Sequence, residues 1–179
     1  ETSRLWRRVV QEMASQYPDV VVDFLYVDNA AMQMILNPKR FDVILTENLF
    51  GDVISDEASV IGGSIGLLAS ASIGDQHAMF EPIHGSYPDA TGKNMANPVA
   101  SILSAAMLLE HFDLHNEAEL IKAAVDRSLE LGITTPDLND NYNNITTSKV
   151  GDFIADFIAH PYDTNANFNN IHMGQSTII

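Results

Sequence analysis

The sequence contains no cysteine in its 179 residues. That absence excludes disulfide bonds, thiolate-bound zinc and a cysteine nucleophile. Positive charge is also scarce, because Lys and Arg number 9 against 24 Asp and Glu, and the formal net charge is −15. Nucleic acids and anionic membrane surfaces are bound through clustered Lys and Arg, so this balance argues against both as partners.

Long hydrophobic runs are missing as well. The longest uncharged stretches, residues 58–74 and 94–109, are shorter than the roughly 20 apolar residues that cross a bilayer. No signal peptide opens the sequence, which begins with Glu1 rather than Met and leads directly into a helical pattern. We therefore expect a cytoplasmic protein with no membrane partner, and a chain that is a piece of a longer one.

The residues that are present, 46% hydrophobic and 18% charged, suit a folded core rather than disorder. Helical periodicity predicts helices over residues 5–13, 29–36, 52–61, 97–112, 116–131 and 147–158. Runs of β-branched and aromatic residues predict strands over 20–27, 41–46 and 79–80, whereas 64–73 is ambiguous between strand and buried helix. Strands alternating with helices indicate an α/β architecture.

Carboxylates carry the first candidate site. Asp52 and Asp56 are four residues apart, so a helix places both on one face, and the strand over 20–27 would deliver Asp28 at its end. Such a set of hard oxygen ligands suits Mg²⁺ or Mn²⁺. The alternative is that these acidic residues only complement the dipole at a helix N-terminus.

The second candidate site is the long loop over residues 81–96, which is rich in Gly and Pro and ends at Asn97. Such a loop lets backbone groups approach a ligand closely, and His84, Asp89 and Asn97 can hydrogen-bond heterocycle edges and ribose hydroxyls. The alternative is an ordinary loop with turn residues. The sequence holds no GxGxxG motif, so a dinucleotide bound here is not held by a Rossmann fingerprint.

Four segments, in the same order along the chain, resemble the sequence motifs of one protein family. They are Tyr-Val-Asp-Asn-Ala-Ala-Met over 26–32, Asn-Leu-Phe-Gly-Asp-Val-Ile-Ser-Asp-Glu-Ala over 48–58, Gly-Ser-Ile-Gly-Leu-Leu over 63–68, and Glu-Pro-Ile-His-Gly-Ser-Tyr-Pro-Asp-Ala-Thr-Gly-Lys-Asn-Met-Ala-Asn-Pro over 81–98. Together they resemble the isocitrate/isopropylmalate dehydrogenase family of metal-dependent β-decarboxylating dehydrogenases. The resemblance extends over about residues 1–159 and matches the C-terminal half of such an enzyme.

The resemblance implies the non-Rossmann α/β fold of that family, here partial and made of parts of two domains. Residues 1–62 would be the C-terminal part of the dimer-forming, metal-binding domain. Residues 63–160 would be the C-terminal part of the NAD-binding domain, and the Asn-rich residues 161–179 a poorly ordered tail.

The resemblance also implies roles for individual residues. Asp28, Asp52 and Asp56 match the metal-binding aspartates. Asp89 matches the residue at the adenosine ribose, where a carboxylate favours NAD over NADP because it repels a 2′-phosphate. The catalytic Lys and Tyr of the family would lie upstream of Glu1, so no catalytic residue is expected in this chain. The full set of expected NAD-binding residues is Glu81, His84, Gly85, Ser86, Tyr87, Pro88, Asp89, Ala90, Thr91, Gly92, Lys93, Asn94, Met95, Ala96 and Asn97.

The implied activity is the NAD-dependent, metal-assisted oxidative decarboxylation of 3-isopropylmalate, a small 2-hydroxy acid of leucine biosynthesis, by a homodimer with shared active sites. Tartrate, D-malate, homoisocitrate and isocitrate are alternative substrates within the family. A different class of function is a dimerisation and nucleotide-binding module without catalysis, and we expect the isolated chain to be inactive. A regulatory subunit is a third possibility, although such subunits tend to lose the metal aspartates.

Overall fold

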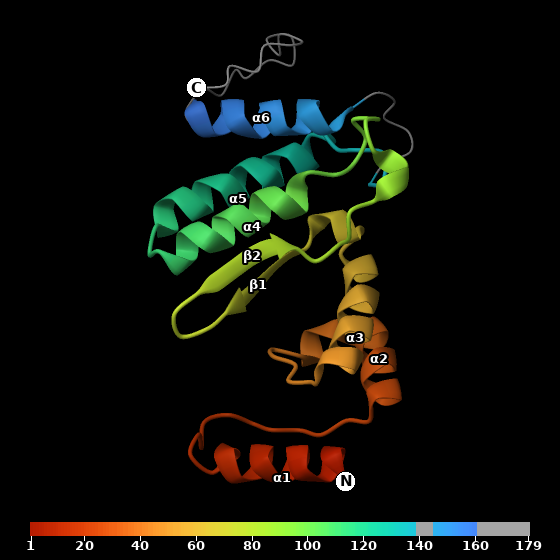
Figure 1. Cartoon of the computed structure of the whole chain (residues 1–179), viewed down its shortest axis with the longest axis vertical. Coiled ribbons are helices and arrows are strands. Elements are labelled where there is room, and N and C mark those ends of the chain that lie inside the picture. The colour runs from red at the N-terminus through yellow and green to blue at the C-terminus, as the bar shows by residue number, and fades with distance from the viewer. Residues whose placement is uncertain (139–144, 161–179) are drawn as a thin grey trace. The chain divides into compact units, whose positions relative to one another are not determined.

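The computed structural model describes residues 1–138 and 145–160, and the expectation for the tail over 161–179 lies outside them (Figure 1). The chain divides into two compact units, the first ending at Ile54 and the second beginning at Ser55. Both helices and strands are present, as the α/β prediction required. In the described part of the chain, no helix is both long and apolar enough to span a membrane.

The first unit is mainly helical. It contains α1 (Thr2–Ala14), α2 (Val27–Leu36), the short 3₁₀ helix η1 (Pro38–Arg40) and the beginning of α3 (Asn48–Ile61). The helix α1 is amphipathic but has no buried residue, and Leu5, Trp6, Val9 and Met13 on it are all exposed. Its predicted helical span is therefore confirmed, while its apolar side chains are not covered within the described residues.

The two strands predicted in this unit are wrong. Residues 21–26 and 41–47 form no strand, and α2 already begins at Val27. Val21 is 95% exposed and Val43 is 88% exposed. A strand is stable only when neighbouring strands satisfy its backbone and cover one face, and these segments have neither among the described residues. The β-branched pattern is real, but the pairing that turns such a pattern into a strand is missing.

The second unit is built on a hairpin. Strands β1 (Ala69–Ile73) and β2 (Ala78–Pro82) are antiparallel, with Ala69 opposite Pro82 and Ile73 opposite Ala78. The strand predicted at 79–80 is confirmed. The ambiguous segment over 64–73 becomes the 3₁₀ helix η2 (Ile65–Leu67) followed by β1.

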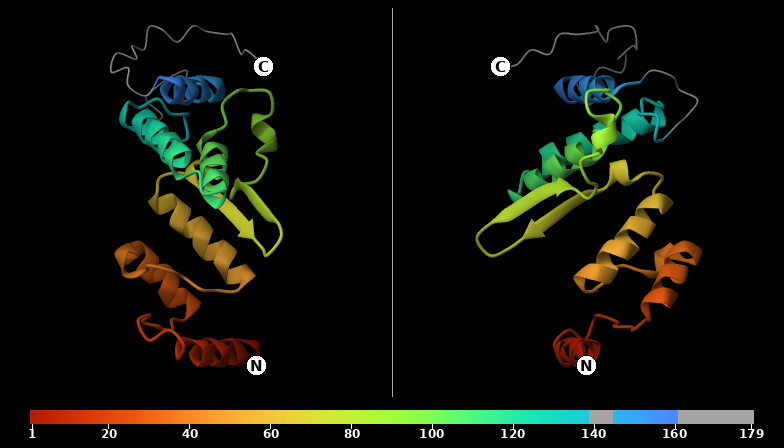
Figure 2. Two further views of the ribbon diagram at one scale, coloured as in Figure 1. Left: turned by 90° about the vertical axis from the view of Figure 1, so that its left-hand side faces the viewer. Right: turned by 45° about the vertical axis from the view of Figure 1, so that its right-hand side comes forward.

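Three helices follow the hairpin, each packed on the element before it. The helix α4 (Val99–His111) packs on β1 and β2, α5 (His115–Glu130) packs beside α4, and α6 (Thr147–Ala159) packs on α5 (Figure 2). Small residues line the contacts of α4 and α5, which lets the two backbones approach closely. Ala100, Ala106, Ala118 and Ala124 are each fully buried. The core cluster contains Val99, Ala124, Val125, Ile133, Val150, Phe153 and Ile154.

The end of α5 follows a local rule, whereas its beginning does not. At the end of α5, Gly132 has a φ of 68°, its N–H donates to Leu129 O, and Ile133 N–H donates to Ser128 O. This is a Schellman motif, as the predicted stop at Gly132 requires. The helix α5 begins at His115, one residue before the predicted span over 116–131, and it has no side-chain cap.

Candidate functional site

The helix α3 carries two of the three candidate metal ligands. Both carboxylate oxygens of Glu47 accept hydrogen bonds from the helix N-terminus, from Leu49 N at 2.9 Å and Phe50 N at 2.8 Å. This cap satisfies two of the N–H groups that lack an intrahelical partner. Asp52 and Asp56 follow at a spacing of one turn, so they share a face of α3, and both are exposed. Asn48 Nδ2 donates to Asp52 Oδ2 over 3.2 Å.

Asp28 lies in the first turn of α2, not at the end of a strand, because the predicted strand does not form. Its side chain is exposed, and its Oδ1 accepts from Asn29 N at 2.9 Å. Over residues 1–138 and 145–160, no group of three or more His, Asp or Glu side chains is placed to hold a metal ion. The metal role of Asp28, Asp52 and Asp56 therefore stays a prediction, supported by a donor set made entirely of hard oxygen ligands.

The loop after β2 begins with a histidine that has one unused ring nitrogen. The Nδ1 of His84 lies 2.9 Å from Gly85 O. A carbonyl oxygen can only accept, so Nδ1 carries a proton, and in the neutral tautomer that this requires Nε2 is an acceptor. Nε2 is buried and has no hydrogen-bond partner among the described residues. An orphaned acceptor of this kind fits a ligand that offers an N–H or O–H group.

The following residues form a succession of tight turns. Tyr87 has a φ of 44°, Gly92 of 73° and Asn94 of 52°, all in the left-handed region. Between them lies the 3₁₀ helix η3 (Pro88–Ala90), in which Asp89 is exposed while Ala90 is 8% exposed and anchors the turn. The carboxylate of Asp89 is thus held on a short, constrained segment and is open to solvent.

Four hydrogen bonds fasten the end of this loop to the start of α6. Asn94 Oδ1 accepts from Ser148 N at 3.0 Å and from Ser148 Oγ at 2.8 Å. Thr147 N donates to Asn94 O at 3.1 Å, and Thr147 Oγ1 donates to Ala96 O at 2.6 Å. The loop therefore has a fixed C-terminal end, because α6 is itself packed into the core.

Asn97 belongs to a cluster centred on Asp137, a residue that the sequence analysis missed. Asp137 Oδ2 accepts from Asn97 Nδ2 at 3.0 Å and from Ser64 Oγ at 2.5 Å, and its Oδ1 accepts from Thr135 Oγ1 at 2.6 Å. Three separate segments meet at this one carboxylate. One feature of the sequence could have pointed to Asp137, because it is the only charged residue between positions 131 and 138.

The predicted cofactor residues lie near one another along the second unit, from the end of β2 through the loop that leads to α4. Glu81 lies on β2 opposite Ser70 and is exposed. The exposed backbone turns, the orphaned His84 nitrogen and the open carboxylate of Asp89 fit a polar ligand such as a dinucleotide. The other expected residues are mostly exposed, with Ala96 half-buried, and comprise Gly85, Ser86, Pro88, Thr91, Gly92, Lys93, Met95 and Ala96.

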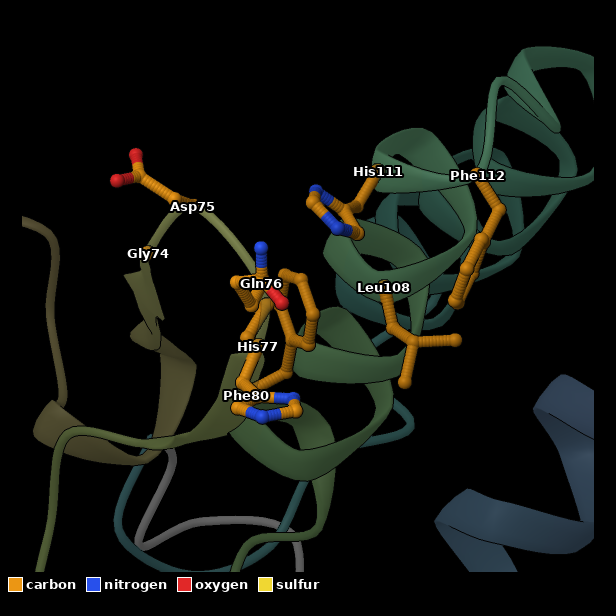
Figure 3. Close-up of a pocket in the computed structure, with 9 residues that line it drawn as sticks. Gly74, Asp75, Gln76, His77, Phe80, Leu108, His111 and Phe112 are labelled. Atoms are coloured by element: carbon orange, nitrogen blue, oxygen red, sulfur yellow. The ribbon is translucent and has the colours of Figure 1, made fainter.

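A separate pocket of about 290 Å³ lies between the hairpin tip and the end of α4 (Figure 3). The ring centroids of Phe80 and His111 are 5.5 Å apart there, and those of His111 and Phe112 are 5.4 Å apart. The pocket contains none of the predicted metal or cofactor residues. Its lining consists of Gly74, Asp75, Gln76, His77, Ala78, Phe80, Leu108, His111 and Phe112.

Comparison with known proteins identifies the class. The sequence profile of the family described as isocitrate/isopropylmalate dehydrogenase matches residues 1–154. The chain therefore belongs to the isocitrate/isopropylmalate dehydrogenase family, and the resemblance inferred from its motifs is confirmed.

Similar proteins within the family include several 3-isopropylmalate dehydrogenases. The chain is 55% identical over 158 residues to a 3-isopropylmalate dehydrogenase of Bacteroides fragilis, covering 88% of this chain and 45% of that protein. It is 54% identical over 156 residues to a 3-isopropylmalate dehydrogenase of Thermotoga maritima, covering 86% and 44%. The chain thus spans somewhat less than half the length of these curated relatives.

Solved structures confirm the fold class. An isocitrate dehydrogenase from Methylococcus capsulatus superimposes with a TM-score of 0.85 at 42% identity, covering 88% of this chain and 46% of that one. A β-decarboxylating dehydrogenase from Thermococcus kodakarensis gives a TM-score of 0.76 at 40% identity, covering 90% and 47%. The fold is that of this family, present here in part.

Proposed function

We propose that this chain is the metal- and NAD-binding part of a cytoplasmic dehydrogenase of leucine biosynthesis that oxidises and decarboxylates 3-isopropylmalate. The observation that carries the proposal is the 55% identity to the Bacteroides fragilis 3-isopropylmalate dehydrogenase across 88% of the chain. In the overall reaction the carbon that bears the 2-hydroxyl would lose a hydride to NAD and the hydroxyl a proton. The carboxylate on the neighbouring carbon 3 would leave as CO₂, and carbon 3 would take up a proton in its place.

Asp52 and Asp56 would hold the divalent cation, Mg²⁺ or Mn²⁺, together with Asp28 from a second copy of the chain. Their position on one exposed face of α3 supports this assignment, since like charges at this spacing repel unless a cation lies between them. When bound, the cation would stabilise negative charge on the substrate oxygen, and NAD would accept the hydride.

The loop from Glu81 to Asn97 would hold NAD. His84 Nε2 offers a buried acceptor, Asp89 offers a carboxylate to the ribose hydroxyls, and Asn97 lies near the adenine. The clasp between Asn94 and α6 keeps this loop in place before the cofactor arrives, which reduces the entropy lost on binding.

The isolated chain would bind the nucleotide without turnover. The general base, the proton donor and the arginines for the substrate carboxylates are expected outside it. By itself the chain would therefore be a dimerisation and nucleotide-binding module without catalysis. This alternative is favoured because the chain spans only 45% of the Bacteroides fragilis protein.

A chimera tests the proposal directly. Residues 1–154 replace the matching segment of the Bacteroides fragilis 3-isopropylmalate dehydrogenase, and NAD reduction is followed with 3-isopropylmalate, isocitrate, D-malate and tartrate in the presence of Mn²⁺. We expect turnover of 3-isopropylmalate that is abolished by Asp52→Asn and kept by the matched surface change Asp126→Asn. A folded chimera that is inactive, or that is active with Asp52→Asn, would contradict the proposal.

The shared active site has its own test. Mixing Asp28→Asn chimeras with Asp52→Asn chimeras puts both lesions into one site of a heterodimer and leaves the other site intact, provided that Asp28 acts in the neighbouring subunit. Activity should then return toward half of the unmodified value from two inactive parents. No recovery in a verified heterodimer would show that each site is closed within one chain.

A further inference from the structure

We propose that Asp137 is a positioning residue that determines nucleotide specificity, because it fixes the orientation of the Asn97 amide and thereby makes the site select adenine over hypoxanthine. The inference rests on the proposed function in one respect, that Asn97 faces the base of the bound dinucleotide. Asp137 itself need not touch the nucleotide.

The amide of Asn97 is held from two sides by groups of opposite character. Its Nδ2 donates to Asp137 Oδ2 at 3.0 Å, and its Oδ1 accepts from Val99 N, at the start of α4, at 3.0 Å. A carboxylate can only accept and a backbone N–H can only donate. An amide turned by 180° would place oxygen against oxygen and N–H against N–H, so only one orientation is satisfied.

The carboxylate that sets this orientation is itself anchored. Ser64 Oγ donates to the same Oδ2 at 2.5 Å, and Thr135 Oγ1 donates to Oδ1 at 2.6 Å. Ser64 Oγ also accepts from Gly66 N at 3.0 Å, so it is fixed in turn by the start of η2. Hydrogen bonds to a charged acceptor are the strong ones, and three of them orient the exposed carboxylate of Asp137.

The oriented amide of Asn97 can still make further hydrogen bonds. One of the two Nδ2 hydrogens and one lone pair of Oδ1 are not used by Asp137 or Val99. Asn97 is only partly buried, and the role assigned to Asp137 requires that these two free groups face the base. An asparagine amide of fixed orientation complements an adenine edge, which presents a donor at N6 beside an acceptor. Hypoxanthine presents an acceptor at position 6, so one of the two contacts is lost or becomes repulsive.

A substitution of Asp137 that removes its carboxylate should weaken the discrimination between adenine and hypoxanthine. In Asp137→Asn the new amide can present either its oxygen or its NH₂ group to Asn97. Only the bond from Val99 N then still favours the native orientation, so turning the Asn97 amide to suit hypoxanthine costs less than in the unmodified chain. A site that cannot adapt leaves polar groups unpaired with the wrong ligand, whereas an adaptable site does not.

The experiment measures the dissociation constants of the full chain for NADH and for reduced nicotinamide hypoxanthine dinucleotide by nicotinamide fluorescence. We expect the unmodified chain to bind NADH about tenfold more tightly, the value of one hydrogen bond of about 1.4 kcal/mol. Asp137→Asn should reduce the ratio below about threefold, while Asp152→Asn, an exposed change of equal charge on α6, should leave it unchanged. In an Asn97→Ala background Asp137→Asn should have no further effect on the ratio.

The outcomes are separable. Failure of the unmodified chain to bind NADH would contradict the proposed cofactor site and this role with it. NADH binding with a ratio that Asp137→Asn does not change, or that it changes equally in the Asn97→Ala background, would overturn this role alone. If Asp137→Asn does not fold, Ser64→Ala replaces it, since it loosens the same carboxylate, and an unchanged ratio there would count against the role.

Discussion

The backbone of Gly66 lies directly against the side chain of Asn97. A Cβ at position 66 would be 2.7 Å from Asn97 Cβ and 3.0 Å from its Nδ2. The short 3₁₀ helix η2 therefore forms a wall of the Asn97 site, and only glycine leaves room for that asparagine where it stands.

Gly66→Ala should consequently destabilise the second unit by roughly 1–3 kcal/mol, the usual cost of overpacking, and weaken nucleotide binding as Asn97 is displaced. Thermal unfolding and NADH fluorescence check both effects. Gly151→Ala is the matched control, because a Cβ there meets nothing within 4 Å and Gly151 lies inside α6. It should stabilise the chain by roughly 0.5–1 kcal/mol. Equal stability of the two variants would contradict the close approach.

Asn94→Gly tests the clasp between the loop and α6. Glycine keeps the φ of 52° but removes the oxygen that accepts from Ser148 N and Oγ. We expect a loss of about 1–2 kcal/mol and faster proteolysis of the loop, since two hydrogen bonds at a helix N-terminus disappear. Ser148→Ala, which removes one of the two, should show a smaller loss. A loop with unaltered protease resistance would argue that the clasp does not hold it.

Lys122 joins α4 to α5 and makes stability depend on pH. The hydrogen bond to Glu110 raises the pKa of Lys122 above its ordinary value, and the bond to Glu119 adds to the shift. A raised pKa means that the stabilisation is fully present below the ordinary lysine pKa and is lost as the pH rises through the raised one. Lys122→Met should therefore lower the Tm at neutral pH, and the difference from the unmodified chain should vanish in strong alkali. A difference that persists when the amine is deprotonated would assign it to packing.

Asp89→Lys in the chimera should shift cofactor preference from NAD toward NADP. The change removes a carboxylate that repels a 2′-phosphate and supplies a cation for it. The ratio of kcat/KM for the two cofactors is the measurement. An unaltered preference for NAD would show that Asp89, although exposed on η3, does not face the ribose.

The elements that the sequence predicts well are those decided by neighbours along the chain. The spans of α1, α4 and α6 follow from side chains three and four residues apart, and the end of α5 follows from Gly132. The strands over 20–27 and 41–46 were predicted by the same local logic and are wrong, because pairing with distant segments decides whether a strand forms.

The same limit applies to the Asn97 site. Its motif is legible in sequence, but Asp137 lies 40 residues beyond Asn97 and 73 beyond Ser64, and no spacing rule connects them. The hydrogen bonds that orient Asn97 appear only after η2, the start of α4 and the turn after α5 have come together. The metal role of Asp28, Asp52 and Asp56 also remains a prediction, since no group of three or more such side chains is placed to hold a metal ion among the described residues.

The exposed, unpaired segments around Val21 and Val43 also affect how the chain associates with other copies of itself. Their backbones pair with no strand among the described residues, and the side chains of Val21 and Val43 are 95% and 88% exposed. Such stretches can pair with the same stretch of another molecule. A net charge of −15 opposes such encounters. That repulsion reaches only about 10 Å in 0.1 M salt and about 3 Å in 1 M salt. Added salt should therefore promote association of the chain through these stretches, and dilute buffer should oppose it.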